Sequence, residues 1–160
     1  MKPQQNGPVP LAAHHVLNDF DSGVAGLDNW LRKIARLAAA ANTSQTFVVA
    51  DAENTVLGFY SLAAGSLIRE EATSRAKRGA GKHPIPMALV TRLAVTRSAQ
   101  GQGLGASLLV DAVSRVKQIR NQIGIRLLAV HALDDSSRDF YLKFGFEPSP
   151  IAPGLLLLVL

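Results

Sequence analysis

Three closely spaced glycines mark the part of this chain that is best suited to bind an anion. Gly101, Gly103 and Gly105 follow an apolar run typical of a strand and open a segment whose apolar residues have helical spacing. Glycines let successive main-chain N–H groups turn toward one point, and a helix start adds unpaired donors and a positive dipole end. Residues 100–106, here called the glycine turn, therefore predict a site for a phosphate or diphosphate.

A dinucleotide is one possible ligand for the glycine turn. Residues 101–106 fit the pattern G-x-G-x-x-A, and Asp134 could serve as the ribose-binding acid. However, residues 96–100 separate the strand from the first glycine, and only residues 107–160 remain for further parallel strand and helix units. The spacing therefore disfavours this interpretation.

A second pattern fits the same turn and a segment further along the chain. Gln100, Gly103 and Gly105 satisfy Gln-x-x-Gly-x-Gly after a strand, which resembles motif A of the GNAT superfamily of acetyl-CoA-dependent N-acetyltransferases. The segment 134–146, with an aromatic pair before Gly-Phe, resembles motif B of that family. The resemblance implies an α/β (α+β) GNAT fold, in which helices flank a mixed central sheet of six to seven strands. Asp134 and Ser137 differ from the Asn and Ala of many members.

The flanking segments narrow the resemblance to the tRNA-acetylating toxins of type II toxin–antitoxin systems. These segments are 22–31, 46–49, 58–63, 92–95 and 140–150. The resemblance implies acetyl transfer from acetyl-CoA to the α-amino group of aminoacyl-tRNA, which blocks translation. It also implies a homodimer and a ribbon-helix-helix antitoxin, whose complex with the toxin binds operator DNA and represses the operon.

The resemblance assigns roles to particular residues. Tyr141 matches the catalytic tyrosine. The residues expected to bind the cofactor lie on the strand before the turn, in the turn itself and beside Tyr141: Leu93, Ala94, Val95, Gln100, Gly101, Gln102, Gly103, Leu104, Gly105, Ala106 and Phe140. No metal is expected.

The proposed chemistry needs an acid, an oxyanion donor and a neutral amine. A phenol with a pKa of ~10 is protonated at neutral pH, so Tyr141 can donate to the departing sulfur. A main-chain N–H around 93–95 is the expected oxyanion donor. Residues 87–95 hold no carboxylate, which suits an α-amine of pKa ~8 better than a lysine of ~10.4. His131 or a water chain could act as base, although a structural role is the simpler interpretation of His131.

Basic residues are clustered along the chain. Seventeen Lys and Arg stand against twelve Asp and Glu, which gives a formal charge of +5, and this excess favours an acidic or phosphorylated partner. The residues expected to bind tRNA are Arg32, Lys33, Arg36, Arg75, Lys77, Arg78 and Arg92. A purely solvated surface remains the alternative for each cluster.

Length and composition limit the remaining possibilities. The 160 residues are expected to form one acetyltransferase domain, with residues 1–12 as an extended lead-in. The chain has no cysteine, so neither a disulfide nor an acyl-cysteine intermediate can form. No apolar run reaches the ~18 residues of a membrane span, and no signal peptide is recognised. A cytoplasmic location is therefore expected.

Apolar periodicity predicts the elements that position these residues. Leu27, Leu31, Ile34, Ala35 and Ala38 have the spacing of a buried helix face, as do Leu104, Leu108, Ala112 and Val116. A further helix is expected after Asp134 or Asp135 as its cap. Strands are expected at 46–50, 56–62, 87–95, 124–131, from 145, and at 155–160, with a basic, partly helical or loop segment at 65–86.

Two other functions remain open at this point. One is a GNAT enzyme that acetylates a protein N-terminus, a polyamine or an antibiotic, although cationic substrates fit poorly with a basic protein. The other is a non-catalytic module that binds CoA or regulates DNA, and the presence of Tyr141 together with an intact glycine turn argues against it.

Overall fold

The computed structural model describes residues 6–160. The strands are β1 (Asn6–Pro10), β2 (Gln45–Ala50), β3 (Val56–Leu67), β4 (Ile85–Val95), β5 (Leu127–His131), β6 (Glu147–Pro148) and β7 (Leu155–Val159). The helices are α1 (Ala25–Lys33), α2 (Ala35–Ala40), α3 (Ser74–Lys77), α4 (Leu104–Ile119) and α5 (Asp135–Lys143), with short 3-10 turns η1 (Arg69–Glu71) and η2 (Arg97–Ala99). Among residues 6–160, no helix is long and apolar enough to cross a membrane.

The strands form a mixed sheet in the order β1-β2-β3-β4-β5-β7-β6. β4 and β5 are parallel, whereas β1 with β2, β2 with β3, β5 with β7, and β6 with β7 are antiparallel. The expected mixed sheet flanked by helices is therefore confirmed. A doubly wound parallel sheet, which the dinucleotide interpretation requires, is excluded.

The chain divides into two compact units. The first unit comprises residues 1–63 and 92–112, and the second comprises residues 64–91 and 113–160. The glycine turn belongs to the first unit, and Tyr141 belongs to the second.

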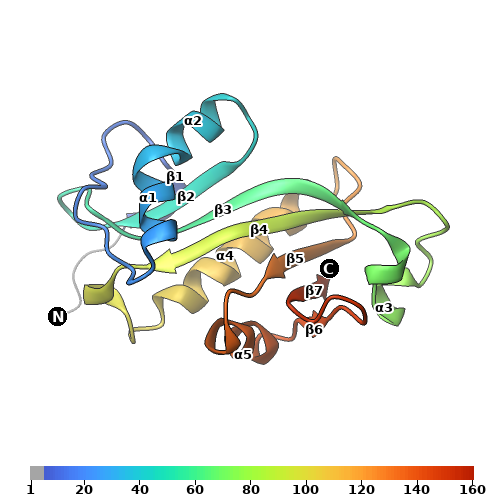
Figure 1. Ribbon diagram of the computed structural model, residues 1–160. Coiled ribbons are helices and arrows are strands. Elements are labelled where there is room, and N and C mark those ends of the chain that lie inside the picture. The colour runs from blue at the N-terminus through green and yellow to red at the C-terminus, as the bar shows by residue number, and fades with distance from the viewer. Residues whose placement is uncertain (1–5) are drawn as a thin grey trace. The chain divides into compact units, whose positions relative to one another are not determined.

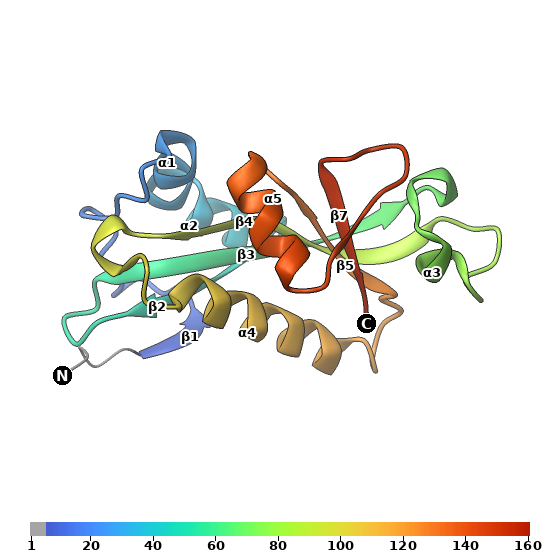
Figure 2. The same ribbon diagram turned by 90° about the horizontal axis from the view of Figure 1, so that it is seen from below.

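In the first unit, helices cover both faces of the strands. Figures 1 and 2 show α1 and α2 on one face of β2 and β3, and the first turns of α4 on the other. On the first face, Phe59 meets Phe20 edge to face at 5.5 Å and stacks with Trp30 at 6.2 Å between ring centroids. On the α4 face, Gly58 lies against Leu104 and Leu108. Alternation along β3 thus separates two packing layers.

A buried polar contact joins α4 to β3 in the first unit. The hydroxyl of Tyr60, which is fully buried, donates to Oδ2 of Asp111 on α4. The Tyr60 ring also stacks on Phe47 of β2, with 5.2 Å between centroids. The beginning of α4 is therefore held to the sheet by both apolar packing and a charge-assisted hydrogen bond.

The core of the second unit is built on β5 and β7. Leu127 and Ala129 pair with Val159 and Leu157 and pack with residues around α3 and η1. Arg126 holds α3 through hydrogen bonds from Nη2 to the carbonyls of Arg75 and Arg78 at 3.3 and 2.5 Å. Figure 1 shows α5 close to β7.

Three expectations about the elements need correction. The helix predicted across residues 27–38 breaks at Ile34, whose φ of −119° ends α1, so Ile34 is 47% exposed rather than buried. β3 continues five residues beyond Leu62 and beyond its pairing with β2, through an Ala- and Gly-rich stretch whose strand propensity is low, with β4 as its other neighbour in the sheet. The strand predicted at 124–131 begins only at Leu127.

Gly58→Ala should destabilise the protein by about 1 kcal/mol, since an added Cβ would lie 3.0 Å from Leu108 Cδ1 and 3.2 Å from Leu104 Cδ2. Gly26→Ala is the matched control, because Gly26 lies in α1 and its Cβ would meet nothing within 4 Å. That change should stabilise by about 0.5 to 1 kcal/mol through helix propensity. Urea unfolding measures both, and equal effects would contradict close packing at Gly58.

Candidate active site

The glycine turn presents main-chain donors that the fold does not use. Gly101 and Gly103 have φ values of +78° and +82°, in the left-handed region that favours glycine. α4 begins at Leu104, and Gly105 lies inside its first turn rather than in the loop. Within residues 6–160, the N–H groups of Gly103, Leu104, Gly105 and Ala106 make no hydrogen bond. Four consecutive donors are therefore available to a ligand.

The surroundings of these donors suit a diphosphate. The first turn of α4 contains no acidic residue, and a Cβ at Gly101 or Gly103 would meet no protein atom within 4 Å. The helix dipole adds to the attraction for negative charge. Charge, space and donors at the turn therefore fit the phosphate groups of a coenzyme, with Gly101 to Ala106 as the residues that would hold them.

The turn is held by the side chain of Gln100, which the sequence singled out, and by other side chains to which it gave no role. The Gln100 amide donates to the carbonyls of Ser22 at 3.0 Å and Val95 at 2.9 Å. The buried Thr96 accepts from the Asp21 N–H at 3.0 Å. Ser22 and Asp28 lie in the segment 22–31 that carries the resemblance, but the sequence gave them no role, because their contact with each other depends on the path of the loop before α1.

The expected coenzyme-binding strand extends beyond its pairing with β5. The parallel register joins Met87–Val90 to Leu127–Val130, while β4 continues to Val95. Among the described residues, Leu93, Ala94 and Val95 therefore lie past the last β4–β5 pair. Their main-chain N–H and C=O groups on that edge do not pair with β5. This suits the predicted role of residues 93–95 in binding the coenzyme.

Tyr141 lies in the second unit on α5, a helix with a complete N-terminal capping box. Asp134 Oδ1 accepts from the Ser137 N–H at 2.8 Å, and Ser137 Oγ accepts from the Asp134 N–H at 3.1 Å. The predicted cap is therefore Asp134. The hydrogen bond from the Ser137 N–H holds the pKa of the Asp134 carboxyl below its usual value, and the capping box gives a structural reason for the two departures from motif B.

Aromatic rings enclose the Tyr141 side chain. Tyr141 is 5% exposed and meets Phe140 and Phe146 edge to face at 5.1 and 5.5 Å between centroids. Burial raises the pKa of its phenol to about 12, because the phenolate would lose its hydration. The hydroxyl has no hydrogen-bond partner within residues 6–160. The Tyr141 hydroxyl is therefore protonated at neutral pH and has no acceptor for its proton within the described residues.

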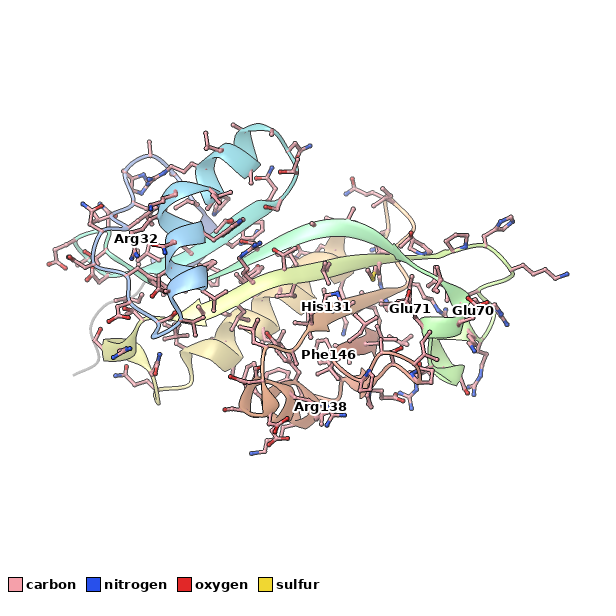
Figure 3. The ribbon with its side chains drawn as sticks, viewed as in Figure 1. Arg32, Glu70, Glu71, His131, Arg138 and Phe146 are labelled. Carbon is pink, nitrogen blue, oxygen red and sulfur yellow. The ribbon has the colours of Figure 1, made fainter. Side chains whose placement is uncertain are left out.

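His131 occupies an exposed position at the end of β5, as Figure 3 shows, while Phe146 lies inside beside α5. His131 pairs with Leu155 through the backbone. Within the described residues, the His131 imidazole forms no ion pair with a carboxylate that would orient it. It therefore gives no particular support for His131 as a base.

The expected tRNA-binding residues differ in what they do in the fold. In the first unit, Arg32 and Arg36 donate to the carbonyls of Phe20 at 2.6 Å and His15 at 2.8 Å, so both hold the loop before α1. Arg92 lies 4.2 Å from the Trp30 ring centroid, and desolvation lowers its pKa. Lys33 is exposed on α1.

The basic residues of the second unit lie on and after α3. Arg75 forms an exposed ion pair with Glu147, with 3.5 Å between Nε and Oε1. The Arg78 side chain is exposed and that of Lys77 is half-buried. Such an exposed ion pair contributes little to stability, so this segment can offer its charges to a partner.

Comparison with known proteins places the chain among acetyltransferases. The acetyltransferase (GNAT) domain family matches residues 43–148. A "tRNA-acetylating toxin" of Mycobacterium tuberculosis (strain ATCC 25618 / H37Rv) is 42% identical over 144 residues, which is 90% of this chain and 86% of the relative.

Solved toxin structures match the fold over nearly the whole chain. The structure of AtaT complexed with acetyl-methionyl-tRNAfMet has a TM-score of 0.89 and 26% identity, covering 99% of this chain and 95% of that one. A tyrosine-to-phenylalanine mutant of AtaT, bound to the C-terminus of the antitoxin AtaR and acetyl-CoA, has a TM-score of 0.82 and 26% identity, covering 98% and 92%. With its family match and its glycine turn, the chain belongs to the GNAT acetyltransferase family and is an acetyl-CoA-dependent N-acetyltransferase.

Proposed function

We propose that this protein is the toxin of a type II toxin–antitoxin pair and that it acetylates the α-amino group of aminoacyl-tRNA. The observation that carries the proposal is the glycine turn with its four unused N–H donors, in a chain so similar to a tRNA-acetylating toxin. Acetyl-CoA, when bound, supplies the acetyl group as a reactive thioester. Incubation with labelled acetyl-CoA, and with charged tRNA or peptides as alternative acceptors, tests the activity directly. Label on the peptides but not on the tRNA would overturn the proposal.

The protein's own residues have distinct tasks in this proposal. The N–H groups of Gly103 to Ala106, with Gly101 and Gln102 before them, hold the diphosphate, and Leu93, Ala94 and Val95 hold the pantetheine arm. Tyr141 holds its proton on the hydroxyl at neutral pH and donates it toward the leaving sulfur, while Phe140 keeps water from that hydroxyl. The α-amine is partly neutral already, so a strong base on the protein is not required.

The partners follow from the same reasoning. AtaT was solved with a segment of its antitoxin AtaR, which supports a protein antitoxin here. A ribbon-helix-helix type, operator binding by the complex, a homodimer and a cytoplasmic location complete the proposal. An upstream reading frame for a small ribbon-helix-helix protein would support this arrangement.

Tyr141→Phe should lower kcat by about 10²-fold or more, because it removes the proton donor but keeps the ring. The affinity for acetyl-CoA should stay within about twofold, and expression should no longer arrest growth. With a pKa of about 12, the wild-type phenol remains protonated below pH 10, so its ionisation should not reduce activity there. Full activity in the variant would remove Tyr141 from the mechanism.

Gly103→Ala should weaken acetyl-CoA binding by about tenfold or more, because a residue with a Cβ is strained at a φ of +82° and the strain would displace the N–H donors of the turn. The matched control is Gly81→Ala, since Gly81 also has a positive φ, +73°, and open space around it. Both variants place a Cβ at a similar positive φ, but Gly81 lies outside the glycine turn. Only Gly103→Ala should therefore change the dissociation constant for acetyl-CoA, as measured by calorimetry. Equal binding by the two would place the coenzyme elsewhere.

Lys33→Ala and Lys77→Ala should each weaken tRNA binding. The slope of log K against log salt concentration should fall in magnitude by roughly 1 for each phosphate that the protein no longer neutralises. Neither side chain makes a hydrogen bond within residues 6–160, so stability should hardly change. Lys117→Ala, an exposed lysine of α4, serves as the control. Unchanged slopes in all three variants would leave these lysines as solvated surface.

A further inference from the structure

A hydrogen-bonded junction in the first unit joins the glycine turn to the loop before α1. The junction comprises Asp21, Ser22 and Asp28 on one side and Thr96, Arg97 and Gln100 on the other. The Arg97 N–H donates to the Asp21 carbonyl at 2.7 Å, and Arg97 Nε lies 3.5 Å from Asp21 Oδ1. The Thr96 N–H also donates to Leu57 of β3 at 2.8 Å. The entry to the turn is therefore fixed from two directions.

The Gln100 side chain has no donor left for a phosphate. Its Nε2 carries two hydrogens, and these are directed to the carbonyls of Ser22 and Val95. The other polar atom of the side chain, Oε1, is an acceptor and would repel a phosphate oxygen. In this geometry the glutamine of the Gln-x-x-Gly-x-Gly pattern closes the turn rather than binding the ligand.

Ser22 is fixed in turn by a buried carboxylate. Asp28 is 5% exposed and accepts from the Ser22 N–H at 3.0 Å and from its Oγ–H at 2.6 Å. Hydrogen bonds to a carboxylate are among the stronger ones in proteins. Asp28 is part of α1, so the carbonyl that receives Gln100 is tied to that helix.

We propose that Gln100, Ser22 and Asp28 are positioning residues that keep the N–H groups of residues 103–106 aimed at the coenzyme diphosphate, without touching it. This inference rests on the proposed use of the turn by acetyl-CoA. A turn released from Ser22 would sample other conformations. Binding would then have to order the four N–H donors, and the entropy lost in that ordering would weaken coenzyme affinity. The junction should therefore affect coenzyme affinity more than the rate of the bound complex.

Gln100→Ala and Ser22→Ala should each raise the dissociation constant for acetyl-CoA by about 3- to 10-fold, the range of one ordinary hydrogen bond. Their KM for acetyl-CoA should rise by a similar factor, while kcat at saturation changes by less than about twofold. Gln45→Ala is the matched control, because Gln45 Nε2 also bonds two acceptors in the first unit, Asn42 Oδ1 at 2.9 Å and the Ala39 carbonyl at 3.4 Å. That variant should bind as the wild type does.

Two further measurements separate positioning from direct contact. The double variant Gln100→Ala/Ser22→Ala should bind no more weakly than the worse single variant, because the two changes break successive links of the same path from Gln100 through Ser22 to Asp28. Asp28→Asn should raise the dissociation constant in the same way, and the Arg97 amide should exchange hydrogen faster in it. Additive losses in the double variant, or a normal dissociation constant in Gln100→Ala, would overturn the inference.

The wild type distinguishes this inference from the proposed function. If wild-type protein binds acetyl-CoA and Gln100→Ala binds it equally well, the junction has no positioning role and the proposed function stands. If the wild type does not bind acetyl-CoA, the proposed use of the turn fails and this inference fails with it.

Discussion

The packing of α4 on β3 is the constraint on which the proposed coenzyme site depends. A helix start attracts an anion only where its first N–H groups are open and correctly placed. Gly58 lets Leu104 and Leu108 approach the strand closely, and Tyr60 adds a hydrogen bond to Asp111. The fold thereby fixes a row of main-chain donors and gives them no acceptor within residues 6–160.

Burial gives Tyr141 a property that the residue type alone does not have. The pKa of the phenol is about 12, whereas the conjugate acid of a thiolate has a pKa of ~8.5. Complete transfer of the proton from the phenol to a thiolate would therefore be unfavourable by roughly 5 kcal/mol. In the proposed mechanism the hydroxyl therefore acts as a hydrogen-bond donor to the sulfur, or as an acid that regains a proton in the same step. The aromatic enclosure favours this behaviour by excluding water.

The basic residues show that charge alone does not define a binding surface. Arg32 and Arg36 use their guanidinium groups to hold carbonyls of the loop before α1, and Arg92 stacks on Trp30. Planar guanidinium groups suit such fixed contacts, whereas a lysine ammonium remains a hydrated point charge. The arginines of the first unit therefore have structural duties that Lys33 lacks.

The sequence alone predicted the mixed sheet, most elements and the family, because apolar periodicity and glycine spacing are local signals. Leu104, Leu108, Ala112 and Val116 are all buried, as their spacing indicated. Ile34 was misjudged, since a break between two short helices changes which face points inward without altering the local pattern.

Only the tertiary structure decided what holds the glycine turn and what surrounds Tyr141. The contact between Ser22 and Gln100 spans 78 positions, and the pKa of Tyr141 depends on how completely its ring is enclosed. Both result from the path of the folded backbone. A local pattern reveals which residues can do the chemistry, whereas long-range packing determines which hydrogen bonds and protons they keep.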